Sequence, residues 1–199
     1  MLQSDLFAKT LKEAPKDEQA ISAQLLQRAG FVDKLMAGVY SFLPLGLRVL
    51  KKIENIIREE MNGAGGQEIF LPVLQPKEIW QKTGRWQDFD ALYKLKGRDG
   101  KEMALGPTHE EVVVNLAKNF IDSYKDLPVY LYQIQTKFRD EFRVKSGLLR
   151  NREFLMKDLY SFHNSQEDLD KFYENMKKIY QRLFKRCGLE SLIVEASGG

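Results

Sequence analysis

The stretch from Arg139 to Asp158 contains six arginine or lysine residues and four aspartate or glutamate residues. Guanidinium groups bind phosphate oxygens through two parallel hydrogen bonds, and Phe154 offers an aromatic surface on which a base can stack. The chain contains neither a GxGxxG sequence nor a GxxxxGK sequence followed by Ser or Thr, so the usual phosphate loops are absent. The stretch would suit a nucleotide bound by side chains, but on these residues alone a charged hairpin exposed to water is the favoured interpretation.

Two predicted strands, residues 127–142 and 152–163, flank this charged loop. Side chains two residues apart share one face of a strand. On the first strand, the face expected to meet the core contains Tyr132, Ile134, Thr136 and Phe138. The opposite face, expected to line a wet surface, contains Gln133, Gln135, Lys137, Arg139 and Glu141. One face of the second strand contains Phe154, Met156, Asp158, Tyr160 and Phe162.

Other chemically notable residues have simpler interpretations. His109 and His163 lie far apart without a metal-ligand spacing, and the single cysteine, Cys187, excludes an internal disulfide. No metal ligand is therefore predicted. Trp80 and Trp86 are expected to pack in the core or anchor a loop rather than contact a ligand.

The remaining elements follow from hydrophobic period and from glycine and proline positions. Apolar residues between Leu47 and Met61 recur every three or four residues, which predicts a helix that the glycines at 63–66 end. A strand with Pro72 inside it is expected at 67–74, and a hairpin at 91–108. Helices are expected at 108–121, with Thr108 as its cap, and at 165–188, with a capping box from Ser165 to Asp168. Residues 29–46 are expected to be irregular, and a strand is expected to begin at 189. The order of elements predicts an antiparallel α+β domain.

Composition limits the class of protein only loosely. Lysine and arginine total 31 against 28 acidic residues, a net charge of +3 that permits an anionic ligand without demonstrating one. No apolar run approaches the roughly 18 residues of a membrane span, and the N-terminus lacks the apolar core of a signal peptide. A cytoplasmic protein with no membrane partner is therefore expected.

Several segments resemble motifs of bacterial-type prolyl-tRNA synthetases, a family of class II aminoacyl-tRNA synthetases. FRDEF at 138–142, followed by RNREFLMKD at 150–158, is similar to the second class II motif, Phe-Arg-x-Glu, a variable loop and Arg-x-x-x-Phe. GPTHEE at 106–111 resembles the family's Thr-x-Glu substrate loop. Residues 38–62 and 67–74 resemble the first motif, a dimer-interface helix and strand. Together with KDLYSFH, this combination is specific to the prolyl enzymes, and the resemblance covers nearly the whole chain.

The resemblance implies a role for each matching residue of the nucleotide site. Arg139, the expected catalytic residue, would bind the α-phosphate of ATP and the carboxylate end of the substrate. Glu141 would accept a hydrogen bond from the adenine amino group, and Arg150 would reach the outer phosphates. Phe154 would stack on adenine, and Mg²⁺ is expected between the phosphates.

The resemblance also implies a proline site. Thr108 and Glu110 would bind the imino group, since a cationic secondary ammonium requires a carboxylate. Residues on the same strand face as Phe154 would shape or support the pocket: Met156, Asp158, Tyr160 and Phe162. The implied reaction is attack of the proline carboxylate on the α-phosphorus of ATP, followed by prolyl transfer to tRNA(Pro).

The sequence departs from the family in what it lacks. The third class II motif, the editing insertion and the anticodon-binding domain are absent, so residues 1–199 are expected to form the N-terminal part of a class II catalytic domain. The fold would be an antiparallel sheet flanked by helices, incomplete in this chain, and the complete enzyme would be a homodimer. The alternative is a non-catalytic module, derived from a synthetase, that binds a partner or RNA.

Overall fold

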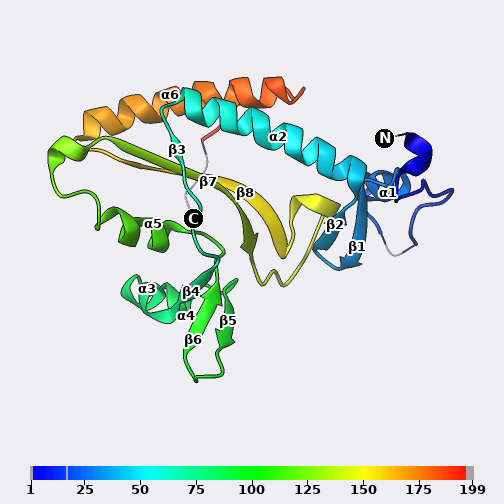
Figure 1. Cartoon of the computed structure of the whole chain (residues 1–199), viewed down its shortest axis with the longest axis horizontal. Helices are drawn as coiled ribbons and strands as arrows, with labels where there is room; N and C mark the ends of the chain where they lie inside the picture. Colours follow the sequence, from blue (N-terminus) through cyan, green and yellow to red (C-terminus); the bar gives the residue numbers. More distant parts are fainter. Residues whose placement is uncertain (1, 17, 196–199) are drawn as a thin grey trace. The chain divides into compact units, whose positions relative to one another are not determined.

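The structure is a computed structural model that describes residues 2–16 and 18–195. It divides into two compact units. Figure 1 labels the helices and strands named below. Unit 1 comprises residues 1–51, 71–115 and 135–156, and unit 2 comprises residues 52–70, 116–134 and 157–199. Four elements run through both units: helices α2 (Pro44–Gly63) and α5 (Glu110–Ala117) and strands β7 (Val129–Phe138) and β8 (Glu153–Phe162).

The N-terminal part of unit 1 contains a β-hairpin where irregular structure was predicted. After η1 (Gln3–Asp5) and α1 (Ile21–Arg28), strands β1 (Val32–Met36) and β2 (Val39–Phe42) pair antiparallel. The turn between them contains Gly38, whose φ of 78° is accessible to glycine at little cost. The prediction was wrong because Ala-Gly is a weaker hairpin signal than Asn-Gly or Asp-Gly.

A three-stranded antiparallel sheet forms the second part of unit 1. Its strand order is β4 (Leu74–Pro76), β6 (Glu102–Leu105) and β5 (Tyr93–Lys96), so the predicted hairpin at 91–108 is confirmed. Two short helices that were not predicted, α3 (Lys77–Lys82) and α4 (Arg85–Asp88), follow β4. They bury the two tryptophans in a core whose members are Trp80, Trp86, Leu92 and Ala104. The packing role expected of both tryptophans is thereby confirmed.

The predicted strand at 67–74 is broken into two short pieces. β3 (Gln67–Glu68) pairs parallel with β7 and is followed by irregular backbone as far as β4. Pro72 lies in the irregular part, where its missing N–H costs no ladder hydrogen bond. β3 is one edge of the sheet β3-β7-β8, which is therefore mixed rather than wholly antiparallel.

Burial along β7 differs from the sequence prediction. The polar side chains of Gln133, Gln135 and Lys137 are buried, whereas Ile134 and Phe138 are only partly buried. The polar side chains are covered because each has a partner. Gln135, for example, donates from Nε2 to the carbonyl of Leu71 at 3.0 Å. Alternation was predicted correctly, but polarity did not indicate which face is exposed.

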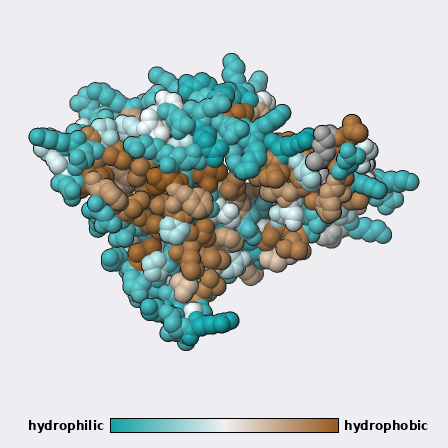
Figure 2. All heavy atoms as spheres, viewed as in Figure 1, coloured by the Kyte–Doolittle hydropathy of each residue, from teal (hydrophilic) through white to brown (hydrophobic). Residues whose placement is uncertain are grey.

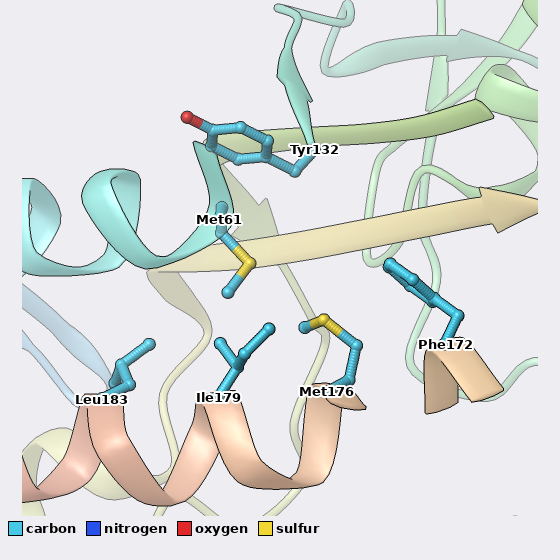
Figure 3. Close-up of a cluster of buried hydrophobic side chains, with 6 residues drawn as sticks. All are labelled: Met61, Tyr132, Phe172, Met176, Ile179 and Leu183. Atoms are coloured by element: carbon cyan, nitrogen blue, oxygen red, sulfur yellow. The ribbon is translucent and has the colours of Figure 1, made fainter. Parts of the chain in front are cut away.

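Helix α6 (Gln166–Arg186) supplies most of the core of unit 2. Figure 3 shows its apolar side chains pointing toward the sheet residue Tyr132 and toward the end of α2. The buried members of this cluster are Met61, Tyr132, Phe172, Met176, Ile179 and Leu183.

The two ends of α6 test further predictions. Ser165 caps the helix by accepting from the Asp168 N–H at 3.2 Å, as predicted. The Asp168 carboxylate contacts His163 Nδ1 at 2.6 Å, so the reciprocal half of the capping box is replaced. The strand expected at 189 does not form over residues 189–195, and residues 196–199 of that segment lie outside the described part.

Helices and strands are thus both present and the α+β class is confirmed. Within the described ranges, no helix is long and apolar enough to cross a membrane.

Candidate active site

The loop from Gly106 to Glu110 follows strand β6 in unit 1. Gly106 donates from its N–H to the Val73 carbonyl at 2.9 Å and accepts from the Phe138 N–H at 3.1 Å. Helix α5 (Glu110–Ala117) then begins, and the His109 carbonyl accepts from the Val113 N–H at 2.9 Å. The cap position therefore falls on His109, and the prediction of Thr108 as the cap was wrong by one residue.

The backbone carbonyl of Thr108 contacts a buried glutamine from another strand. Gln75 Nε2 donates to the Thr108 oxygen at 3.1 Å, and Gln75 is fully buried. Sequence reasoning missed Gln75, because a single glutamine between leucine and proline gives no signal of a partner thirty residues away.

Arg139 follows β7 and connects the loop with the charged segment. Its Nε and Nη2 atoms each lie 3.4 Å from the Pro107 carbonyl oxygen. Its guanidinium carbon lies 5.3 Å from the centre of the Phe154 ring, within the range of a cation–π contact. The predicted phosphate ligand and the predicted adenine platform are therefore adjacent.

Glu141 and Arg150 form an ion pair across the charged segment. The Glu141 Oε2 atom lies 2.8 Å from Nε and 2.7 Å from Nη2 of Arg150. The Glu141 side chain is 14% exposed and that of Arg150 is 57% exposed. A long loop was predicted at residues 142–153; the structure has it at 139–152, with a short helix, η3 (Gly147–Leu149), inside it. Arg152 stabilises the loop by donating from Nε to the Glu141 carbonyl at 3.2 Å.

The carboxylate of Glu110 is the most accessible acid of the loop. Its side chain is 63% exposed and its Oε2 lies 3.6 Å from Arg85 Nη1. The same arginine nitrogen contacts Glu111 Oε1 at 2.7 Å, and the Glu111 side chain is 2% exposed. Arg85 thus neutralises a buried acid while leaving Glu110 open to a cationic ligand.

A buried lysine of β7 supports the loop. Lys137 Nζ contacts His109 Nδ1, and both residues are fully buried. Lys137 had been assigned to a wet face. The distance along the chain hides this contact, because His109 and Lys137 are 28 residues apart.

Three of the predicted pocket residues lie in unit 2, and Met156 lies in unit 1. Asp158 Oδ2 accepts from Gln133 Nε2 at 3.0 Å and from the Tyr160 hydroxyl at 2.7 Å. Phe162 and Met156 are partly buried. The carboxylate of Asp158 is therefore oriented by hydrogen bonds within its own unit.

Metal chemistry has no obvious ligand set. Among residues 2–16 and 18–195, no group of three or more His, Cys, Asp or Glu side chains is arranged to bind an ion. His163 pairs with Asp168 and lies 5.5 Å, centre to centre, from the Phe172 ring, so it packs against the core of unit 2.

In unit 1, Arg139 contacts both the loop that contains Thr108 and Glu110 and the ring of Phe154, which gives a charged and aromatic surface. Arg139 supplies a cation, Phe154 a ring face, and Glu110 an exposed anion. Such a surface suits a ligand that has a phosphate, an aromatic base and a positive group. Because no side chain of this surface is arranged as a nucleophile, the surface can act by positioning the reacting groups and by stabilising charge that develops on them.

Comparisons with known proteins find relatives along the whole chain. The chain is 54% identical to the proline--tRNA ligase of Thermotoga maritima and 56% identical to that of Dehalococcoides mccartyi, in each case over the full chain and 35% of the relative. The chain thus spans about a third of the length of these relatives. A crystal structure of prolyl-tRNA synthetase from Cryptosporidium parvum, complexed with L-proline and AMP, matches with a TM-score of 0.72. It is 16% identical, and the match covers 82% of this chain and 34% of that one.

The family model of the tRNA synthetase class II core domain (G, H, P, S and T) matches residues 93–198, just over half of the chain. The chain belongs to this class II core domain family.

Proposed function

We propose that this chain is the N-terminal part of the catalytic domain of a prolyl-tRNA synthetase. In the proposed reaction, the proline carboxylate attacks the α-phosphorus of ATP, pyrophosphate leaves, and prolyl-adenylate forms. Transfer of the prolyl group to tRNA(Pro) follows. The identity of 54–56% with proline--tRNA ligases over the full chain supports this substrate class.

The observation that carries the proposal is the position of Arg139. Its guanidinium group contacts the carbonyl of Pro107, next to Thr108, and lies over the ring of Phe154. One cation is therefore adjacent both to the loop proposed to bind proline and to the ring proposed to stack on adenine. The α-phosphate and the attacking carboxylate meet between those two ligands, where a fixed positive charge stabilises the transition state most.

Neighbouring residues take the supporting roles. Glu141 needs only one carboxylate oxygen for the adenine amino group, and both contacts of Arg150 go to Oε2. Arg150 is exposed enough to turn toward the outer phosphates. For the proline side, Thr108 and Glu110 bind the imino group and Met156 forms part of the wall. Asp158, Tyr160 and Phe162, further along β8, shape or support the pocket.

We propose that ATP binds as its magnesium complex, in which the phosphate oxygens coordinate the ion. No step is assigned to a metal bound by the protein. The proposed partners are proline, ATP and tRNA(Pro), in the cytoplasm, with a homodimer as the complete enzyme.

Proline-dependent exchange of pyrophosphate into ATP by the unsubstituted full-length enzyme tests the activity. Calorimetric titration with a prolyl-adenylate analogue then compares Arg139→Ala with Arg98→Ala. Arg98 is exposed in the turn between β5 and β6 and is the control. Loss of one charge-assisted contact is worth about 1.5–3 kcal/mol, so Arg139→Ala is expected to weaken binding of a prolyl-adenylate analogue by roughly one to two powers of ten. Equal effects of the two substitutions would remove Arg139 from the site. Absence of any exchange by the unsubstituted enzyme would favour a non-catalytic binding module.

A further inference from the structure

A buried polar chain links the core of unit 1 to the loop that contains Thr108. Trp80 Nε1 donates to Gln75 Oε1 at 3.0 Å, and Gln75 Nε2 donates to the Thr108 carbonyl at 3.1 Å. Both Gln75 and Trp80 are fully buried. The hydrogen bonds therefore run from the indole of Trp80 in α3, through the amide of Gln75, to the backbone of the substrate loop.

The indole of Trp80 fixes the orientation of the Gln75 amide. An indole N–H is only a donor, so the amide atom that faces it must be the carbonyl oxygen. The opposite end of the Gln75 amide is then the NH₂ group, which is the end that a carbonyl such as that of Thr108 requires. Trp80 thereby selects one of the two amide orientations, and that orientation stabilises the loop.

Gln75 also has little freedom to move. Its backbone lies in β4, opposite Ala104 of β6. A Cβ atom added at Gly106 would lie 2.4 Å from Gln75 Nε2, so the amide is in close contact with the start of the loop. A rigid donor in this place fixes the Thr108 carbonyl, and with it the direction of the Thr108 side chain.

We propose that Gln75 is a positioning residue for amino-acid recognition, and that Trp80 sets its orientation. The inference deepens the proposed function and rests on it, because the ligand placed by Thr108 is taken to be proline. Gln75 acts through the loop and does not touch the substrate. Its removal is therefore expected to weaken proline binding while ATP binding, which uses Arg139 and Phe154, is retained.

The experiment measures the affinities for proline and for ATP, separately, in the full-length enzyme and its variants. Gln75→Met removes both hydrogen bonds, and Gln75→Glu retains an acceptor for Trp80 but removes the donor to Thr108. Each is expected to weaken proline binding about fivefold, the effect of one typical hydrogen bond, with ATP binding changed less than twofold. Gln87→Met, at an exposed glutamine of α4, is the control and is expected to change neither affinity.

A double-mutant cycle tests the role of Trp80. Trp80→Phe retains an aromatic ring in the core but removes the indole donor, and it is expected to weaken proline binding at least twofold. In the Gln75→Met background the same substitution is expected to have no further effect on proline, because its influence passes through Gln75. Additive losses would overturn this part of the proposal.

Gly106→Ala provides a second variant if Gln75→Met fails to fold. The added methyl group is expected to displace the Gln75 amide and to give the same selective loss for proline. Equal losses for proline and ATP in the folded variants, or unchanged proline affinity, would overturn the positioning role. A wild-type enzyme that binds ATP but not proline would instead overturn the proposed function, so the two failures are distinguishable.

Discussion

Two carbonyl oxygens of one short loop, those of Pro107 and Thr108, accept hydrogen bonds from side chains distant in the sequence. Arg139 donates to the first and Gln75 to the second. His109, the next residue, contacts Lys137. Three consecutive residues are thus fixed by partners on β4, β7 and the segment after β7. These contacts fix the loop on which Thr108 and Glu110 lie, and the Glu110 side chain remains 63% exposed.

At this scale the first prediction concerns Glu110→Gln. The substitution retains the shape of the side chain and removes its charge, so the attraction to a cationic imino group is lost. Since Glu110 is 63% exposed without ligand, the expected loss is that of one charge-assisted hydrogen bond, about tenfold in proline affinity. ATP affinity is expected to stay within twofold, as measured by calorimetry on the full-length enzyme.

The matched control is Glu174→Gln. Glu174 lies on α6, is 64% exposed and pairs with Lys177, so it resembles Glu110 in exposure and in having a basic neighbour. It is expected to change neither affinity. Unchanged proline affinity in Glu110→Gln would exclude this carboxylate from the site, and equal losses for proline and ATP would indicate a displaced loop.

At the scale of elements, the start of α2 depends on a glycine. A Cβ atom at Gly46 would lie 2.0 Å from the Phe31 carbonyl oxygen, which already accepts from the Leu43 N–H at 2.9 Å. The Phe31 carbonyl oxygen cannot move away from the added Cβ atom without breaking its hydrogen bond to Leu43. The first turn of α2 is therefore packed directly against the chain that precedes β1.

Gly46→Ala is expected to destabilise the protein by about 1–3 kcal/mol, the usual cost of overpacking, or more. Gly63→Ala, at the other end of the same helix, is the control because a Cβ there meets nothing within 4 Å. The control is expected to be neutral or stabilising by up to about 1 kcal/mol. Denaturant unfolding of both variants measures the difference, and equal stability would contradict the close approach.

The contact between α2 and α6 within unit 2 depends on an acid. Glu60, with a side chain only 5% exposed, contacts Arg182 Nε at 2.6 Å and Arg186 Nη1 at 2.8 Å (both helices in Figure 1). The hydrogen bond from Arg182, together with that from Arg186 and both positive charges, lowers the pKa of Glu60 below its ordinary value of 4.5, against the opposing effect of burial. The folded state therefore favours the ionised carboxylate.

This pKa shift predicts a pH dependence of stability. Because the folded-state pKa of Glu60 is lower than the unfolded one, its contribution is complete above pH 4.5 and is lost as the pH falls through the lowered value. Glu60→Gln is expected to cost about 1–3 kcal/mol at pH 7. The difference between wild type and variant is expected to shrink as the pH falls below 4.5. A difference independent of pH down to pH 2 would contradict the assignment. Glu59→Gln is the control, expected to cost less because Glu59 is 63% exposed.

Elements with a strong local signal could be predicted from the sequence. The helical period of apolar residues predicts α6, and the glycine-rich turn after β5 predicts the hairpin, each from residues close together in the sequence. The hairpin at β1 and β2 could not be predicted, because its Ala-Gly turn and short strands give little pattern. Burial of Lys137 and the role of Gln75 were also inaccessible, since each depends on a partner about thirty residues away. Of the site residues named by motif, Arg139 lies beside Phe154 and beside the loop that contains Thr108, whereas Asp158, Tyr160 and Phe162 lie in unit 2. The residues that anchor the loop emerge only from the structure.

At the scale of the whole molecule, α2, α5, β7 and β8 are shared by both compact units. Large apolar side chains nevertheless stay at the surface (brown in Figure 2). On α2, Val49 and Ile53, one turn apart, are 45% and 38% exposed. After β3, Phe70 is 80% exposed, and Leu74 at the start of β4 is 52% exposed. Exposed apolar residues in the segments that resemble the first class II motif are consistent with the proposed dimer.

The last prediction therefore concerns assembly. We expect the full-length enzyme to sediment as a two-fold dimer, and Phe70→Asp to shift it toward the monomer. An aromatic anchor in an interface contributes about 2 kcal/mol, and the substitution removes the ring from both subunits of a two-fold dimer. Dissociation is therefore expected at roughly thousandfold higher concentration in the variant. Phe120→Asp is the matched control, because Phe120 is 73% exposed but lies outside the segments that resemble the first motif. If the dimer is held by the segment around Phe70, only the first substitution weakens it. A wild-type enzyme that is monomeric at every accessible concentration would exclude the dimer, and equal weakening by both substitutions would exclude Phe70 as its anchor.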